Sequence, residues 1–173
     1  MLVTNRNILD QELQVLIDKC GSDRTALMPT LQAVQRKYGF VTDFAMQKIA
    51  DVLGIHPVEV HGVVSFYSFL SEKPLGRFVI RLCQTISCDM AGKDRVASQL
   101  ENELGIKFGE TTTDKTFTLE WANCIGLCDQ GPALLVNDIL WTKVTPQRVL
   151  EIIEECRARL SPHAIQGQEE NLV

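Results

Sequence analysis

The spacing of hydrophobic residues along the chain changes near residue 75. Before this point, apolar residues recur every three or four positions, with polar residues between them. This period is typical of amphipathic helices. It predicts four helices, over residues 8–20, 24–39, 43–54 and 57–70.

Capping residues agree with these helices. Asp23 and Thr42 stand where the second and third helices begin, and their side chains can accept hydrogen bonds from the free N–H groups there. Gly39 and Gly54 follow the same two helices, where glycine commonly ends a helix. Pro57 fits the first position of the fourth helix, because no hydrogen-bond donor is needed at that position.

The second half of the chain alternates β-rich runs with amphipathic stretches. The expected order is a strand over 77–83, a helix over 92–105, a strand over 115–123, a hairpin over 132–144 and a helix over 146–160. The hairpin turns at Asn137 and Asp138, and Thr145 caps the last helix.

Four helices followed by the order β-α-β-β-β-α predict an α/β fold class. The first strand, its helix and the next strand can form one right-handed parallel crossover, to which the last strands add antiparallel. We expect an N-terminal four-helix domain over 1–72, a thioredoxin-like α/β domain over 73–160 and a polar, loose tail over 161–173.

Composition and charge exclude several classes of function. The 173 residues carry a net charge of −5, whereas nucleic-acid-binding domains usually present a basic surface. No apolar run approaches the roughly 20 residues of a membrane-spanning helix, so we expect no direct membrane insertion. Residues 1–10 lack the residue order of a signal peptide. We expect a soluble, cytoplasmic protein, either free or peripheral to a membrane complex.

The six cysteines divide into two groups. Cys20 and Cys156 continue apolar series at helical spacing, so we expect both to be core residues. The other four form two close pairs, Cys83 with Cys88 and Cys124 with Cys128. In a reducing compartment a disulfide framework is not expected.

The two pairs are predicted to meet at one edge of the sheet. Cys83 ends the first predicted strand, and Cys88 lies in the loop after it. Cys124 ends the second strand, and Cys128 lies in the following loop. Parallel neighbouring strands place both loops at the same end of a sheet. Four thiolates at one point can hold zinc or an iron–sulfur cluster, and a dithiol–disulfide switch is a third interpretation.

The spacing of the pairs favours the cluster. Structural zinc sites usually use tight C-x-x-C turns in small units that need the metal to fold. Here four and three residues separate the paired cysteines, and the pairs flank an α/β core. A two-iron cluster can accept one pair at each iron. Gly126, between Cys124 and Cys128, would let a backbone N–H group approach a sulfur.

The chain resembles the thioredoxin-like [2Fe-2S] subunits of the NuoE type over about residues 8–160. The resemblance is carried by "LQAVQRKYGFVTDFAMQKIADVLGIHPVEVHGVVSFYSFL", "PLGRFVIRLCQTISC" and "FTLEWANCIGLCDQGPALLVND". This family includes the small subunit of the NADH-oxidising module of complex I. It also includes subunits of multisubunit NAD(P)-linked [FeFe] and [NiFe] hydrogenases and formate dehydrogenases. The resemblance implies a ferredoxin domain whose single [2Fe-2S] cluster is held by Cys83, Cys88, Cys124 and Cys128, with one pair on each iron.

The resemblance also implies partners. FMN and NAD(H) would bind to a NuoF-type flavoprotein that exchanges single electrons with this chain, within a complex that contains further iron–sulfur subunits. The sequence has no G-x-G-x-x-G and no phosphate-binding Gly-Lys-Ser/Thr loop, so we expect no NAD or flavin site and no catalytic residue here. The shared motifs leave the parent complex open. The alternative function is a structural or docking module in which the four cysteines hold zinc.

Three further predictions concern residues outside the pairs. A dense apolar cluster precedes the domain boundary at Phe66, Tyr67, Phe69 and Leu70. We expect it to pack against the α/β half or, if exposed, to dock a partner. Trp121 lies in a stretch where the family usually has an acidic residue before the third cysteine, and we expect it to pack locally. Lys93 is expected near the cluster or on a solvated helix face.

Overall fold

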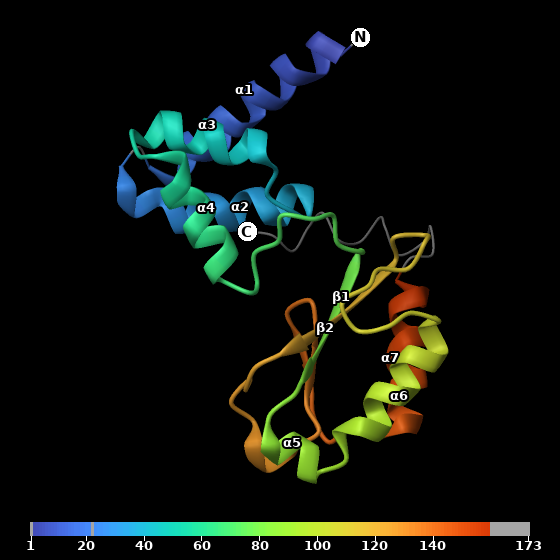
Figure 1. Cartoon of the computed structure of the whole chain (residues 1–173). Helices are drawn as coiled ribbons and strands as arrows, with labels where there is room; N and C mark the ends of the chain where they lie inside the picture. The colour runs from blue at the N-terminus through green and yellow to red at the C-terminus, as the bar shows by residue number, and fades with distance from the viewer. Residues whose placement is uncertain (1, 22, 160–173) are drawn as a thin grey trace. The chain divides into compact units, whose positions relative to one another are not determined.

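The computed structural model describes residues 2–21 and 23–159 (Figure 1). The chain divides into two compact units, Met1–Leu75 and Gly76–Val173, and each unit has a hydrophobic core of its own. The predicted polar tail lies outside the described residues. None of the helices in the described ranges is both long enough and apolar enough to cross a membrane.

The first unit is helical, as predicted. Its elements are α1 (Leu2–Cys20), the 3₁₀ helix η1 (Arg24–Ala26), α2 (Leu27–Tyr38), α3 (Asp43–Leu53) and α4 (Pro57–Phe66). Two boundaries differ from the prediction. The second helix begins as a separate 3₁₀ turn, so Asp23 caps η1 through the N–H of Thr25 instead of capping α2. The fourth helix ends before residue 70, because the backbone of Tyr67 is extended.

The predicted caps and the core explain this unit. Thr42 accepts a hydrogen bond from the N–H of Ala45 at 3.1 Å, and Gly39 and Gly54 end α2 and α3 with positive φ. The helices bury one face each; the most deeply buried residues include Leu13, Ile17, Leu31, Val34, Ile49 and Val60. Cys20 packs against this core but is only partly buried.

The aromatic residues at the end of α4 are exposed. The exposed fractions are 78% for Phe66, 48% for Tyr67 and 51% for Phe69. Leu70 is partly buried against the helical core of the same unit. The side-chain amide of Gln35 holds the following backbone, because its oxygen accepts a hydrogen bond from the N–H of Ser71 at 2.7 Å. The expected burial of the cluster against the α/β half is therefore wrong for the three aromatic residues.

The second unit is a four-stranded sheet in the order β2-β1-β3-β4. The strands are β1 (Phe78–Cys83), β2 (Phe117–Ala122), β3 (Leu134–Val136) and β4 (Ile139–Trp141). β1 and β2 are parallel, whereas β3 pairs antiparallel with both β1 and β4. The predicted α/β class and strand directions are confirmed.

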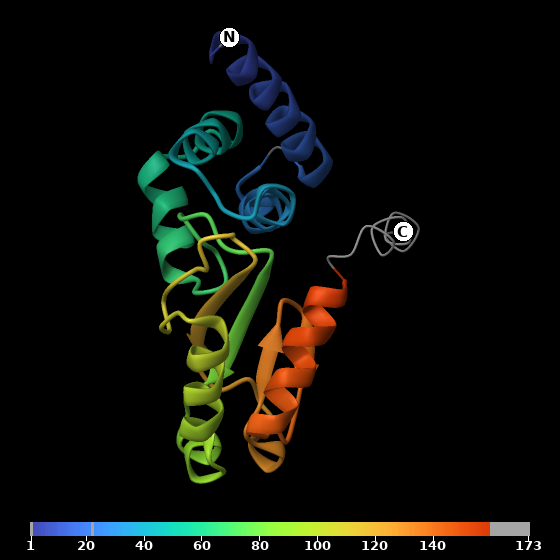
Figure 2. The same cartoon turned by 90° about the vertical axis from the view of Figure 1, so that its right-hand side faces the viewer.

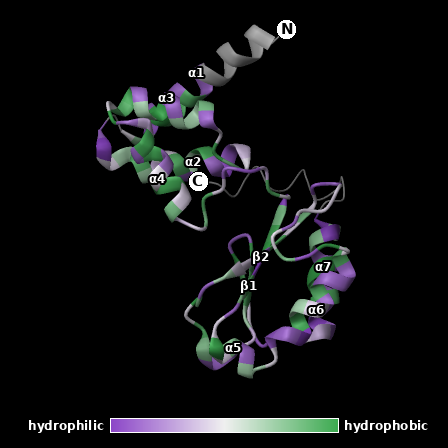
Figure 3. Cartoon of the chain, viewed as in Figure 1, coloured by the Kyte–Doolittle hydropathy of each residue, from purple (hydrophilic) through white to green (hydrophobic). Residues whose placement is uncertain are grey.

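Two long helices cover one face of this sheet. α6 (Lys93–Leu104) and α7 (Pro146–Ala158) lie side by side in Figure 2. Hydrophilic and hydrophobic residues alternate along both helices in Figure 3, as expected for helices that bury one face. The core that they share with the strands includes Ile80, Leu82, Val96, Leu100, Leu119, Ile152, Ile153 and the predicted core residue Cys156.

Candidate iron–sulfur cluster site

The ends of β1 and β2 bring the two cysteine pairs to one edge of the sheet. The parallel strands run in register from Phe78 opposite Phe117 to Cys83 opposite Ala122. Cys83 is the last residue of β1, and Cys124 follows shortly after the end of β2. The loops that carry the two pairs therefore leave the sheet side by side.

The second cysteine of each pair lies on a short helix. Cys88 is in the middle of α5 (Ile86–Met90), and Cys128 begins the 3₁₀ helix η2 (Cys128–Gln130). The prediction that both lie in loops is wrong, because helices of five and three residues are too short to produce a hydrophobic period. These turns return each chain segment toward its strand end, so the second thiol comes close to the first.

Contacts between sulfur atoms join the four thiols. The Sγ atoms of Cys124 and Cys128 are 3.4 Å apart, and the thiols of Cys83 and Cys88 are also hydrogen-bonded. Across the pairs, Cys83 interacts electrostatically with Cys124. Cys88 interacts in the same way with Cys128. Among the described residues, no three histidine, cysteine, aspartate or glutamate side chains are grouped so as to hold a single metal ion.

The two pairs differ in exposure. Cys83 and Cys88 are only 1% and 2% exposed, whereas Cys124 and Cys128 are exposed. Gly131 permits the close packing of the first pair, since a Cβ at this position would lie 3.3 Å from the Sγ of Cys88. One pair is thus enclosed by the protein and the other faces solvent.

In the buried pair, Cys83 is the stronger acid. Burial raises the pKa of Cys83, but hydrogen bonds from Thr85 and Cys88 outweigh burial, and the pKa is lowered. Burial raises the pKa of Cys88, and its hydrogen bond and charge interaction with Cys83 raise it further. Neighbouring thiolates repel each other, so one thiol ionises first and its partner stays protonated.

The exposed pair follows the same pattern for a different reason. The N–H of Gly126 donates a hydrogen bond to Cys124 Sγ at 3.4 Å, and this bond and one from Cys128 lower the pKa of Cys124. The bond to Cys124 in turn raises the pKa of Cys128. Gly126 has a φ of +88°, a conformation that favours glycine. The predicted approach of a backbone N–H group to a sulfur is confirmed.

Two hydroxyl groups beside the thiols were not predicted from the sequence. Thr85 Oγ1 lies 3.2 Å from Cys83 Sγ and also hydrogen-bonds Cys124. The hydroxyl of Ser87 hydrogen-bonds Cys128. The only signal in the sequence is that both residues stand between the cysteines of the first pair. Serine and threonine are ordinary residues at the start of a helix, so this signal is weak.

The residues present fit an iron–sulfur cluster. Four cysteine thiols are the usual ligands of a [2Fe-2S] cluster. The N–H and O–H groups beside the sulfurs supply the outer hydrogen bonds that such sites use to orient their ligands and adjust their potential.

Charged and aromatic residues near the pairs make local contacts. Trp121 stacks on Phe108 with ring centres 3.8 Å apart, as predicted for a packing residue. Lys93 Nζ lies 3.1 Å from Asp89 Oδ1 and 5.4 Å from the centre of the Trp121 ring. The hydrogen bond to Asp89 raises the pKa of Lys93. Only 14% of the Lys93 side chain is exposed, so it does not lie on a solvated helix face.

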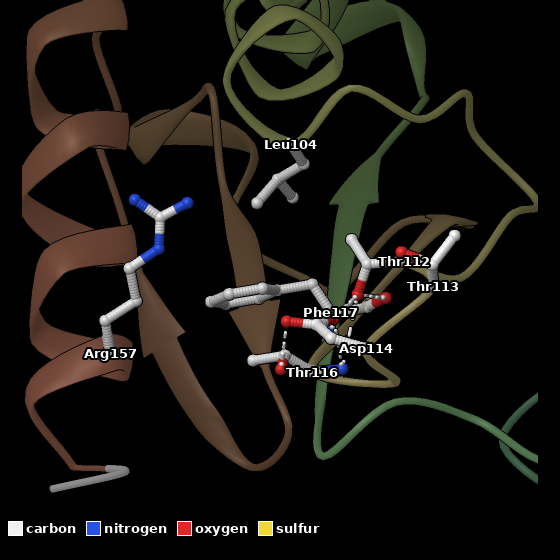
Figure 4. A pocket seen from close by; sticks show the side chains of 7 residues that line it. All are labelled: Leu104, Thr112, Thr113, Asp114, Thr116, Phe117 and Arg157. Carbon is white, nitrogen blue, oxygen red and sulfur yellow. Dashed lines mark hydrogen bonds between the residues drawn. The ribbon is translucent and has the colours of Figure 1, made fainter.

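A cavity of about 470 Å³ lies elsewhere in the same unit (Figure 4). Leu104, Phe117, Arg157 and the threonine-rich turn 112–116 line it. Hydrogen bonds from Thr112 and Thr116 hold the pKa of Asp114 at about 2. This carboxylate is therefore engaged by its own turn.

Comparisons with known proteins agree with the geometry of the cysteine pairs. The family model of the thioredoxin-like [2Fe-2S] ferredoxin matches residues 13–157 of the chain. The chain belongs to this family. The resemblance inferred from the motifs is confirmed.

Relatives within the ferredoxin family are components of larger oxidoreductases. The NuoE-type subunit of the NADH-quinone oxidoreductase of Buchnera aphidicola is 41% identical over 131 residues, which cover 76% of this chain and 81% of the relative. The alpha subunit of the NAD-reducing hydrogenase HoxS of Cupriavidus necator is 34% identical over 157 residues, 91% of this chain and 26% of the relative.

A solved structure gives the same result. The crystal structure of an air-oxidized NAD+-reducing [NiFe]-hydrogenase superposes with a TM-score of 0.66 and 25% sequence identity. The match covers 76% of this chain and 23% of that chain. This chain therefore spans about a quarter of the hydrogenase chains that it matches.

Proposed function

We propose that this chain is the [2Fe-2S] electron-transfer subunit of a multisubunit NAD(P)H-linked oxidoreductase. The observation that carries the proposal is the meeting of four thiols from two parallel strands in a member of a [2Fe-2S] family. The relatives named as subunits of NADH-quinone oxidoreductase and NAD-reducing hydrogenase support the assignment to such a complex.

The four cysteines would divide the ligation between them. Cys83 and Cys88 would hold one iron, and Cys124 and Cys128 would hold the other. The cluster, when bound, supplies one-electron chemistry. The buried pair would fix the site to β1, and the exposed pair would face the side from which a partner can approach. Hydrogen bonds that lower the pKa of Cys83 and Cys124 favour the thiolate form that a metal binds.

Oxidation of NAD(P)H would take place on another subunit. Hydride transfer requires a flavin or an equivalent cofactor, and the sequence lacks the common dinucleotide motifs. We assign FMN and NAD(H) to a NuoF-type flavoprotein, and later electron transfer to further iron–sulfur subunits. The parent complex would be an NADH:quinone oxidoreductase, an NAD-reducing or electron-bifurcating hydrogenase, or a formate dehydrogenase.

The helical part, residues 1–72, would dock this flavoprotein. Support comes from Phe66, Tyr67 and Phe69, which are large, exposed and adjacent in the chain. The Gln35 amide fixes the backbone behind them, so that little ordering would be needed on binding. We expect Phe66→Ser to reduce co-purification with the coexpressed flavoprotein, whereas Val58→Ser, also at an exposed position of α4, leaves it unchanged. Equal losses in both variants would contradict this docking site.

Iron and acid-labile sulfide contents test the ligand assignment. We compare the anaerobically purified wild-type protein with Cys124→Ala, an exposed position where truncation has little effect on folding. Cys20→Ala is the matched control, because Cys20 lies outside the pairs. About two irons and two sulfides are expected in the wild type and the control, with a clear loss in Cys124→Ala. Stoichiometric zinc without sulfide would instead support the docking-module alternative.

A further inference from the structure

Thr85 occupies a helix-capping position without capping the helix. It precedes α5 with extended backbone angles, φ −79° and ψ 162°, as N-terminal capping residues do. Within the described part of the chain its side chain makes no capping hydrogen bond. Thr42 and Thr145 stand in the same position before α3 and α7, and their side chains accept hydrogen bonds from backbone N–H groups. The Thr85 hydroxyl is therefore used for something else.

The hydroxyl faces sulfur atoms of both cysteine pairs. Thr85 Oγ1 is 3.2 Å from the Sγ of Cys83 in the buried pair, and it hydrogen-bonds Cys124 in the exposed pair. Among the described side chains that contact these sulfurs, Ser87 carries the other hydroxyl, and it contacts Cys128. Thr85 is thus the hydroxyl that bridges the two halves of the site.

The direction of this hydrogen bond follows from the chemistry of the ligands. With free thiols, either the sulfur or the oxygen can donate. Cysteines that bind iron are thiolates, which have no hydrogen and can only accept. The Thr85 hydroxyl must then donate, and a hydrogen bond to an ionised acceptor is stronger than one to a neutral acceptor.

We propose that the Thr85 hydroxyl donates a hydrogen bond to the ligand sulfurs of Cys83 and Cys124 and thereby raises the reduction potential of the site. This inference rests on the proposed function. Reduction adds one electron, supplied by a flavin semiquinone or a chemical reductant, and part of its charge is carried by the sulfurs. A donor at these sulfurs favours the reduced form. No bond breaks, and the hydrogen stays on the Thr85 oxygen.

Reduction potentials of three variants test the proposal. Thr85→Val keeps the shape but removes the hydroxyl, and Thr85→Ser restores the hydroxyl. Thr145→Val is the matched control, since it removes a capping threonine at the start of α7. We expect Thr85→Val to lower the equilibrium constant for reduction by about three- to tenfold, where tenfold corresponds to about 59 mV for one electron. Thr85→Ser is expected to restore most of this shift. Thr145→Val is expected to lower the melting temperature without changing the potential.

The outcomes separate this inference from the proposed function. Potentials are measured by redox titration followed by EPR, after iron and sulfide have been quantified in each variant. A Thr85→Val potential equal to that of the wild type, at equal iron content, would overturn the inference and leave the proposed function intact. If Thr85→Val fails to retain iron, the same titration of Thr85→Ala decides, and a wild-type potential there also overturns it. A wild-type protein without iron and sulfide would overturn both.

Discussion

The buried and exposed cysteine pairs meet the same chemical requirement in different surroundings. Cys83 and Cys88 are enclosed between β1 and α5, where burial opposes ionisation of both thiols. Cys124 and Cys128 lie at the surface, where the hydrogen bond from Gly126 is the leading influence on Cys124. Yet in both pairs the first cysteine has a lowered pKa and the second a raised one.

This difference separates what the sheet supplies from what the loops supply. The first pair is fixed by the packing of the domain, whereas the second depends on local hydrogen bonds and the conformation of one glycine. A site built in this way is rigid on one side and accessible on the other. Accessibility on one side suits a carrier that must exchange electrons with a partner.

The largest expected difference between the pairs is in thiol reactivity. In cluster-free protein at neutral pH, Cys124 is expected to react with iodoacetamide at least about 100-fold faster than Cys83, because Cys83 is buried. Mass spectrometry of proteolytic peptides at successive times measures both rates. Urea should abolish most of the difference. Equal rates in the folded protein would contradict the enclosed geometry of the first pair.

Serine substitutions should separate the pairs by stability. Cys88→Ser places a hydroxyl in a buried apolar site, and we expect a loss of about 1–3 kcal/mol in the free energy of unfolding. Cys128→Ser changes an exposed residue and should alter it by less than about 0.5 kcal/mol. Urea unfolding of the cluster-free proteins, followed by circular dichroism, gives both values. A larger loss at Cys128 would reverse the comparison.

A pH series should distinguish the two thiols within the exposed pair. The pKa of Cys124 is lowered from its ordinary value of 9.0, so its thiolate forms first as the pH rises. The pKa of Cys128 is raised from the same value, so its thiolate forms later. Alkylation of Cys124 should therefore reach its half-maximal rate below pH 9.0, and Cys128 above it. The opposite order would remove the role assigned to the Gly126 N–H group.

The smallest expected effect concerns the second hydroxyl. Ser87→Ala removes a hydrogen bond to Cys128, which is exposed and can bond water instead. We expect a change in the equilibrium constant for reduction of less than about threefold, below that of Thr85→Val. The same EPR-monitored titration measures it. A shift larger than that of Thr85→Val would show that the exposed half dominates the potential.

The parts of the fold that were predictable are those with a long period or a clear cap. The helices from Thr42, Pro57 and Thr145 onward have capping residues and apolar faces that the structure reproduces. The parallel pairing of β1 with β2 followed from the handedness of the crossover between them.

The details of the site were less predictable, because they depend on tertiary contacts. Nothing in five residues distinguishes α5 from a loop, and α5 exists in a setting where Cys88 is buried. The pattern also could not foresee that Thr85 turns to sulfur instead of capping a helix. The exposed Phe66 shows the same limit, since hydrophobicity alone does not distinguish a core residue from a docking residue.

The most direct test of the cluster assignment is EPR of the wild-type protein, purified without oxygen and reduced with dithionite. We predict a rhombic spin-one-half signal, accompanied by about two irons and two sulfides per chain. Absence of this signal and of sulfide after iron–sulfur reconstitution, with zinc bound in stoichiometric amount, would contradict the assignment.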